Sequence, residues 1–146
     1  MEVVFHNRST VTEPGLPARQ LPLHELLAIS DFVVIAVPAT PQTHHLIGAA
    51  ELARMQPHAH LVNIARGDIV DEAALIAALE VGQIAGAGLD VFEREPLVPE
   101  ALRALDCVTL LPHLGTAALE VRDAMGFMAL ANLTAFRDGK VPPNAV

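Results

Sequence analysis

The sequence predicts an α/β fold built on a doubly wound parallel sheet. Short runs of β-branched and other apolar residues alternate along the chain with segments of helical pattern, which is typical of strand–helix–strand repetition. Most of the apolar runs are continuous rather than alternating, as expected for parallel strands that are covered on both faces. The chain has 146 residues, of which 52% are hydrophobic, and this is enough for one domain with a buried core.

Five apolar runs are the expected strands, and they span residues 2–5, 32–37, 60–64, 84–89 and 107–111. The only cysteine, Cys107, lies in the last run. It has no partner for an internal disulfide, so we expect a buried and inert thiol.

Three shorter helices are expected between the strands. Pro22 suits the first position of a helix that continues over residues 23–28. A weaker helix is expected from residue 49 to about residue 55. Asp71 is a good N-cap for the third helix, and Gly82 supplies its left-handed end.

The longest helix is expected over residues 116–138, with Gly139 as its stop. Apolar residues recur on one face at helical spacing, and we interpret this face as a packing surface. These residues are Val121, Met125, Ala129, Leu133 and Phe136.

Composition excludes several classes of function. Nine Lys and Arg residues against 17 Asp and Glu residues give a net charge of -8, which argues against nucleic acid as a partner. No apolar run approaches the ~20 residues of a membrane-spanning helix, and no signal peptide precedes the first strand, so we expect a cytoplasmic protein. No Cys and His residues occur at zinc spacing. His44 and His45 are adjacent and should point apart on a regular element, so no metal site is expected.

Polar residues follow the expected strands at the points where ligands gather in such sheets. The first strand leads into Asn7-Arg8-Ser9 and the third into Arg66, while Asp90 ends the fourth and His113 follows the fifth. A cation, a carboxylate and an imidazole therefore converge on one edge of the sheet. Taken singly, each could be an ordinary surface or core residue.

The motifs that contain these residues resemble the D-isomer-specific 2-hydroxyacid dehydrogenases. The resemblance rests on four stretches that occur in the family's order and spacing, and it covers essentially the whole chain. They are residues 38–43 (with Pro38, Thr40, Pro41 and Thr43), 62–67 (with Arg66 and Gly67), 88–96 (with Asp90, Glu95 and Pro96) and 111–116 (with Pro112 and His113).

The resemblance implies a Rossmann-like fold and a catalytic set of Arg66, Glu95 and His113. Arg66 would bind the carboxylate of a small 2-oxo or 2-hydroxy acid, since a guanidinium can form two parallel hydrogen bonds to a carboxylate. His113 would exchange a proton with the carbonyl oxygen, and Glu95 would orient its imidazole. Glyoxylate and hydroxypyruvate are the expected substrates.

The resemblance also implies a nicotinamide cofactor, with Asp90 accepting a hydrogen bond from the carboxamide. The implied cofactor-binding residues are Asn7, Arg8, Ser9, Val37, Pro38, Thr43, Ile64, Ala65, Arg66, Asp90, His113 and Gly115. Enzymes that use NAD usually have an acidic residue after the strand at Asn7-Arg8-Ser9. Arg8 could instead pair with a 2′-phosphate, so we expect NADP in preference to NAD.

The sequence departs from the family at its start. The family's cofactor domain opens with a strand, a Gly-x-Gly-x-x-Gly turn and a helix that holds the pyrophosphate, and this chain has none of them. We therefore expect residues 1–115 to be a truncated cofactor domain, and residues 116–146 to be a long helix and tail leading toward an absent substrate domain.

The missing strand is central in the usual order 3-2-1-4-5-6. The strands at 2–5 and 32–37 should then lose their neighbour toward the strand at 60–64. The gap could be closed by sliding of the two halves, by a second chain or by a longer polypeptide. We expect a truncated piece of a longer protein or gene that pairs with a second copy as a dimer.

Two other functions fit the same fold. One is a non-catalytic dinucleotide-binding module like the C-terminal-binding-protein corepressors, which resemble this family. The other is a different hydride enzyme, such as a formate dehydrogenase, which the arrangement from Glu95-Pro96 to Pro112-His113 disfavours.

Overall fold

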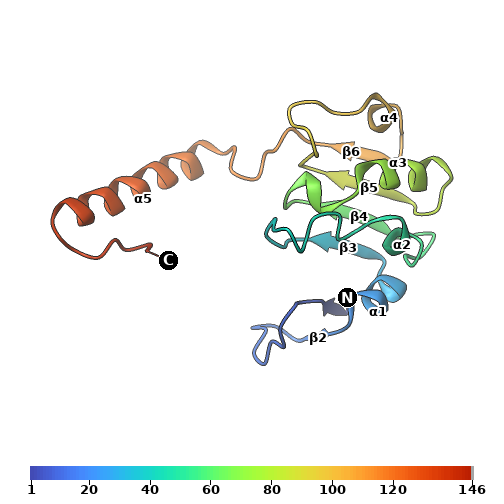
Figure 1. The fold of residues 1–146 in the computed structure, drawn as a ribbon, viewed down its shortest axis with the longest axis horizontal. Helices are drawn as coiled ribbons and strands as arrows, with labels where there is room; N and C mark the ends of the chain where they lie inside the picture. Colours follow the sequence, from blue (N-terminus) through green and yellow to red (C-terminus); the bar gives the residue numbers. More distant parts are fainter. Residues whose placement is uncertain (146) are drawn as a thin grey trace. The chain divides into compact units, whose positions relative to one another are not determined.

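The computed structural model describes residues 1–145 and consists of two compact units, Met1–Pro112 and His113–Val146. The first unit holds all the strands, and the second holds one long helix (Figure 1). In chain order the elements of the first unit are β1 (Val3–Phe5), β2 (Ala18–Gln20), α1 (Leu23–Ile29), β3 (Phe32–Ile35), α2 (Ala49–Leu52), β4 (His60–Asn63), the 3-10 turn η1 (Gly67–Ile69), α3 (Glu72–Glu80), β5 (Gly86–Leu89), α4 (Glu100–Arg103) and β6 (Val108–Leu110).

The main sheet has four parallel strands in the order β3-β4-β5-β6. Its register aligns Ile35 with Asn63, Asn63 with Leu89, and Leu89 with Leu110, so the carboxyl ends of the four strands lie at one edge. The predicted α/β fold with a parallel sheet is confirmed.

β1 and β2 form a separate two-stranded parallel sheet in which Val3 pairs with Ala18. The prediction that the strand beginning at Phe32 loses its neighbour toward the strand of His60 is wrong, because β3 pairs directly with β4 from Phe32–His60 to Ile35–Asn63. The break in the sheet falls between the β1–β2 pair and β3. The order of strands depends on nonlocal pairing, which local sequence patterns do not report.

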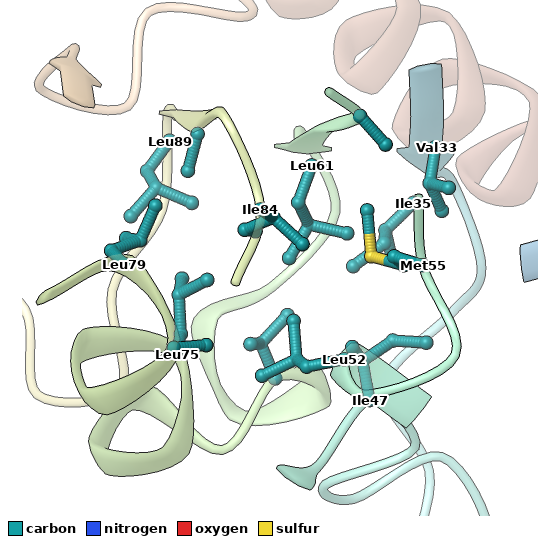
Figure 2. Close-up of a cluster of buried hydrophobic side chains, with 14 of the residues drawn as sticks. Val33, Ile35, Ile47, Leu52, Met55, Leu61, Leu75, Leu79, Ile84 and Leu89 are labelled. Carbon is teal, nitrogen blue, oxygen red and sulfur yellow. The ribbon is translucent and has the colours of Figure 1, made fainter. Parts of the chain in front are cut away.

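The core lies on one face of the main sheet, under helices α2 and α3 (Figures 1 and 2). Leu52 of α2 and Leu75 of α3 face Ile35 and Leu61 of the strands, and all four side chains are buried. Burying side chains of this size is the main stabilising term of such a fold. The remaining buried members of the cluster include Val33, Ile47, Met55, Leu79, Ile84 and Leu89.

The other face of the sheet is open along β3. Phe32 is 65% exposed and Val34 is 57% exposed, whereas Val33 and Ile35 between them are buried. The expectation that the strands are covered on both faces is therefore wrong for β3. Its apolar pattern fits a strand with two covered faces, but within residues 1–145 only one face of it is packed.

Local signals predict α1, α2 and α3 of this unit, with small errors at their ends. Asp71 caps α3 by accepting a hydrogen bond from the Ala74 N–H at 3.0 Å, and Gly82 adopts a φ of 66° after the helix. Pro22 is the N-cap of α1 rather than its first helical residue, and α2 ends at Leu52, earlier than predicted. β2, α4 and η1 were not expected from the sequence, and each is only three or four residues long.

The exposed thiol of Cys107 contradicts the prediction that it is buried. Cys107 directly precedes β6, which is an edge strand of the sheet. Its carbonyl oxygen accepts a hydrogen bond from the Ala87 N–H at 3.1 Å. An apolar run does not distinguish an edge strand from a central one, and this ambiguity explains the error.

The second unit contains α5 (Leu119–Arg137), which begins three residues after the predicted start and ends before Gly139 at a φ of 70°. None of the side chains of α5 is buried. The amide of Asn132 holds the tail, since its Oδ1 accepts from the Asn144 N–H at 3.0 Å. Among residues 1–145, no helix has both the length and the apolar character needed to cross a bilayer.

Candidate functional site

The candidate site lies at the edge of the main sheet where the strands end. Beyond the ladder, the Asp90 N–H donates to the Asn63 carbonyl at 3.0 Å and the Leu111 N–H donates to the Leu89 carbonyl at 2.9 Å. The segments that follow β4, β5 and β6 therefore leave the sheet side by side. This is the edge at which ligands bind in doubly wound sheets.

Asn63 shapes the loop that carries Arg66. Its side chain is 1% exposed, its Nδ2 donates to the Arg66 carbonyl at 2.8 Å, and its Oδ1 accepts from the Ala65 N–H at 3.0 Å. Arg66 itself is exposed, and its guanidinium donates to the Ala65 carbonyl at 2.6 Å. A buried amide thus fixes the backbone while the cation stays accessible to an anion.

Gly67 brings this loop against the loop that follows β5. A Cβ atom at Gly67 would lie 1.9 Å from the Phe92 carbonyl carbon and 2.3 Å from the Glu93 nitrogen. Only glycine permits so close an approach of two backbones. The Arg66 loop and the Glu95 loop are therefore packed together within the first unit.

The carboxylates of the second loop differ in burial. Asp90 is 9% exposed at the end of β5. Glu95 is exposed, and its Oε1 accepts a hydrogen bond from the Phe92 N–H at 3.1 Å. This bond folds the Glu95 side chain back onto its own loop, close to the segment that contacts Gly67.

The loop after β3 contains Val37, Pro38 and Thr43. The Thr43 hydroxyl donates to the Pro38 carbonyl at 2.8 Å and accepts from the Thr40 N–H at 2.8 Å. These bonds close the loop on itself. The hydroxyl of Thr43 is therefore a structural group of the loop, whatever else it contacts.

The loop after β1 is held by Gln20 of β2. The Gln20 amide donates to the carbonyls of Asn7 and Ser9, and its oxygen accepts from the Val11 N–H. The Asn7 amide donates to the Ser9 hydroxyl at 3.2 Å. Arg8 is exposed between them, and residues 6–9 contain no acidic side chain.

His113 and Gly115 belong to the second unit. His113 is exposed and has a φ of 55°, a left-handed conformation that is uncommon for a residue with a side chain. It follows the end of β6 by three residues.

A group of polar side chains that local sequence patterns do not reveal lies beside this edge. Glu93 Oε1 accepts from the Glu72 N–H at 3.0 Å and lies 3.0 Å from His45 Nε2. The pKa of the Glu72 carboxyl is raised above its ordinary value of 4.5, and burial is the largest cause. The negative charge of Glu93 also raises this pKa, whereas a hydrogen bond from the Glu93 backbone and the positive charge of Arg94 lower it.

The prediction that His44 and His45 point apart is wrong. Their rings are stacked with centroids 4.0 Å apart, because the chain turns here and His45 has a φ of 50°. No group of three or more His, Cys, Asp or Glu residues within residues 1–145 is arranged to hold a metal ion.

The residues expected to contact a dinucleotide follow strands of both sheets. Asp90 and the loops after β3 and β4 lie at the strand ends, and the exposed Arg8 follows β1. None of the six described strands is followed by a Gly-x-Gly-x-x-Gly turn that opens a helix. Such a turn is the usual cradle of a pyrophosphate.

Comparison with known proteins gives one consistent family. Residues 1–115 match the family described as D-isomer specific 2-hydroxyacid dehydrogenase, NAD binding domain. The chain is 51% identical to a glyoxylate reductase of Thermococcus gammatolerans and 49% identical to one of Pyrococcus furiosus, in each case over 148 aligned residues. These alignments cover 100% of this chain but only 44% of each relative.

Solved structures agree with the sequence comparison. The NADPH-dependent glyoxylate/hydroxypyruvate reductase of Sinorhizobium meliloti, in complex with NADP and malonate, has a TM-score of 0.88 and 41% identity over 92% of this chain and 42% of its own. The holo form of Rhodotorula graminis D-mandelate dehydrogenase has a TM-score of 0.91 and 38% identity over 100% of this chain and 45% of its own.

Proposed function

The chain belongs to the D-isomer-specific 2-hydroxyacid dehydrogenases, as part of their NAD-binding domain, and on this premise we propose that it carries the catalytic residues of an oxidoreductase acting on small 2-oxo or 2-hydroxy acids. The observation that carries the proposal is the contact of Gly67 with the backbone of Phe92 and Glu93. It packs the loop of Arg66 against the loop of Glu95, at the edge where such sheets bind ligands.

Arg66 is proposed to bind the substrate carboxylate. Its exposed guanidinium sits on a backbone held by Asn63, and a guanidinium of fixed position can donate two hydrogen bonds to a carboxylate and a further one to the adjacent carbonyl oxygen. The substrates proposed are glyoxylate and hydroxypyruvate, in line with the names of the relatives.

His113 is proposed to exchange the proton with the substrate oxygen, and Glu95 to orient its imidazole. Histidine suits this task because its unperturbed pKa lies near working pH. The Phe92 N–H restrains the Glu95 carboxylate. In this proposal the Glu95 carboxylate accepts a hydrogen bond from the imidazole and so fixes the orientation of the ring.

A nicotinamide dinucleotide, when bound, supplies or accepts the hydride. Asp90 is proposed to accept from its carboxamide, with Val37, Pro38, Thr43, Ile64, Ala65 and Gly115 lining the cofactor. At the adenine end, Asn7, Arg8 and Ser9 are proposed to favour NADP over NAD, because Arg8 can pair with a 2′-phosphate and no acid in this loop opposes it.

The test of the catalytic set uses a hybrid enzyme. In this hybrid, the part of the Thermococcus gammatolerans glyoxylate reductase that matches this chain, 148 aligned residues, is replaced by the chain. Arg66→Lys and His113→Gln should each lower kcat/KM for glyoxylate by about 10²-fold or more. Arg103→Lys, a change of an exposed arginine in α4, is the control and should leave it unchanged. Full activity of both site variants would contradict the assignment.

The isolated chain of 146 residues should bind NADPH weakly and turn over slowly, since the pyrophosphate cradle is not in its sequence. A steady-state assay on the purified chain measures this. Turnover equal to that of the hybrid enzyme would show that the cradle is dispensable.

In the hybrid, Arg8→Asp should move the preference from NADPH toward NADH.

An interaction role is the second candidate, and the exposed face of β3 and the unburied side chains of α5 favour it. We propose that the chain self-associates as a dimer through such surfaces. A corepressor-like module would instead bind a different protein in a dinucleotide-dependent way. Pull-down with and without NADPH separates these cases.

A further inference from the structure

Glu93 connects three segments that lie far apart in the sequence. Its Oε1 accepts from the N–H of Glu72, the first residue of α3, at 3.0 Å. The same oxygen lies 3.0 Å from Nε2 of His45, in the loop that follows β3. In return, the Glu93 N–H donates to Glu72 Oε2 at 3.4 Å. Only 22% of the Glu93 side chain is exposed, so this largely buried carboxylate connects the three segments by hydrogen bonds.

The segment that Glu93 holds also carries the proposed catalytic groups. Glu95 lies two residues further on, and the backbone of Phe92 and Glu93 is the surface against which Gly67 packs. Arg66 immediately precedes Gly67. A shift of Glu93 relative to α3 would therefore displace both the Glu95 carboxylate and the Arg66 loop.

The groups around Glu93 act on its charge in opposite directions. A carboxylate at the amino end of a helix is stabilised by the helix dipole and by the free N–H groups there. On its other side, His45 places Nδ1 4.0 Å from the Asp71 carboxylate, so its ring lies between Asp71 and Glu93. Glu72 carries a like charge that opposes Glu93, and Arg94 carries an opposite charge that offsets the negative charge of Glu72.

We propose that Glu93, held by His45 and the amino end of α3, is a positioning residue that sets the geometry of Glu95 and Arg66. The proposal rests on the proposed function, because positioning matters only if these two residues contact substrate. Glu93 itself needs no contact with substrate or cofactor. Without its carboxylate, the loop after β5 loses its hydrogen bonds to the Glu72 N–H and to His45, and keeps only the bond from the Glu93 N–H to the Glu72 carboxylate.

The first experiment measures this coupling in the 146-residue chain, with no ligand present. The probe is the amide of Phe92, whose N–H donates to Glu95. Glu93→Ala should change the chemical shift of this amide. It should also accelerate hydrogen exchange at Phe92 by a factor about ten times larger than the factor at Leu61 in the core. Glu93→Gln, which keeps an acceptor oxygen, should restore most of the protection. Glu100→Ala, at the exposed start of α4, is the matched control and should change neither quantity.

Two results of this experiment would overturn the proposal. One is a Phe92 amide that keeps its shift and protection in Glu93→Ala. The other is an equal acceleration of exchange at Phe92 and Leu61, since this would mean that Glu93 contributes only to global stability.

The second experiment measures kinetics in the hybrid enzyme. Glu93→Ala should lower kcat for glyoxylate by about 10²-fold with little change in the KM for cofactor, and Glu93→Gln should recover most of it. Unchanged kcat in an active hybrid would refute the positioning role. If the unsubstituted hybrid is inactive, the proposed function fails, and the exchange experiment alone decides whether Glu93 sets the geometry of the two loops.

Discussion

Asn63 is a single side chain on which the geometry of the candidate site depends. It lies in a buried strand, yet both ends of its amide are used by the backbone of Ala65 and Arg66. A buried polar group with its partners satisfied specifies one arrangement, because any other arrangement leaves these partners unpaired. The sequence offers one signal for this role, which is an amide in an otherwise apolar run.

Replacing Asn63 by Ala should lower the free energy of unfolding by about 1–3 kcal/mol, since two backbone groups lose their partner and a cavity remains. Asn132→Ala, which removes an exposed amide from α5, should have a clearly smaller effect. Urea unfolding followed by circular dichroism measures both, because the chain has no Trp or Tyr for fluorescence. Equal effects of the two substitutions would remove the special role given to Asn63.

Glu72 gives the fold a pH dependence of defined sign. Burial raises the pKa of its carboxyl above 4.5 in the folded state, so folding favours the protonated form. The stabilising contribution is complete below the unfolded pKa and is lost as pH rises through the folded pKa. Near neutral pH the ionised Glu72 carboxylate therefore lowers the free energy of unfolding.

The variant Glu72→Gln should accordingly gain stability relative to the unsubstituted chain as pH rises from about 4 to 7. Unfolding curves at several pH values measure the difference. Glu100→Gln, at the first position of α4, serves as the matched control and should show no such rise. A difference for Glu72→Gln that stays constant with pH would contradict the effect of burial.

At the scale of elements, α3 was predictable and β2 was not. Asp71 and Gly82 act on their own neighbours, so a local signal is enough to find both ends of the helix. β2 consists of Ala18, Arg19 and Gln20, which lack an apolar pattern, and it is a strand because β1 pairs with it. The candidate site shows the same contrast. Arg66, Asp90 and Glu95 follow strands and lie in family motifs, so the sequence could point to them as candidates. Glu93 depends on contacts with α3 and His45, which sequence spacing does not reveal.

The contact between the Arg66 loop and the Glu95 loop can be tested with one methyl group. Gly67→Ala places a Cβ within 2 Å of the Phe92 backbone, which cannot move aside as a flexible side chain can. We expect a loss of at least about 2 kcal/mol in the free energy of unfolding.

Gly126→Ala provides the comparison for Gly67→Ala. Gly126 lies inside α5 and a Cβ there meets no atom within 4 Å, so the same change should stabilise the helix by about 0.5–1 kcal/mol. Thermal unfolding of the two variants should therefore move in opposite directions. A Gly67→Ala chain as stable as the unsubstituted one would mean that the two loops are not in contact.

At the scale of the whole chain, the four-stranded sheet has one packed face and one apolar face that is open along β3. Phe32 and Val34 are exposed on it, and Ile64 is exposed just beyond β4. The chain spans less than half the length of its relatives. Soluble proteins rarely expose contiguous apolar patches of large area, so these residues mark a surface that is suited to contact with other protein.

We expect the open face along β3 to mediate the proposed self-association. Sedimentation velocity of the 146-residue chain over a range of concentrations should show association that increases with concentration. The double variant Phe32→Thr with Val34→Thr keeps residues suited to a strand but reduces the apolar area, and it should weaken the association. Val81→Thr, which changes another exposed apolar residue outside the sheet, should not. A chain that remains a monomer at every concentration would show that this face does not mediate self-association.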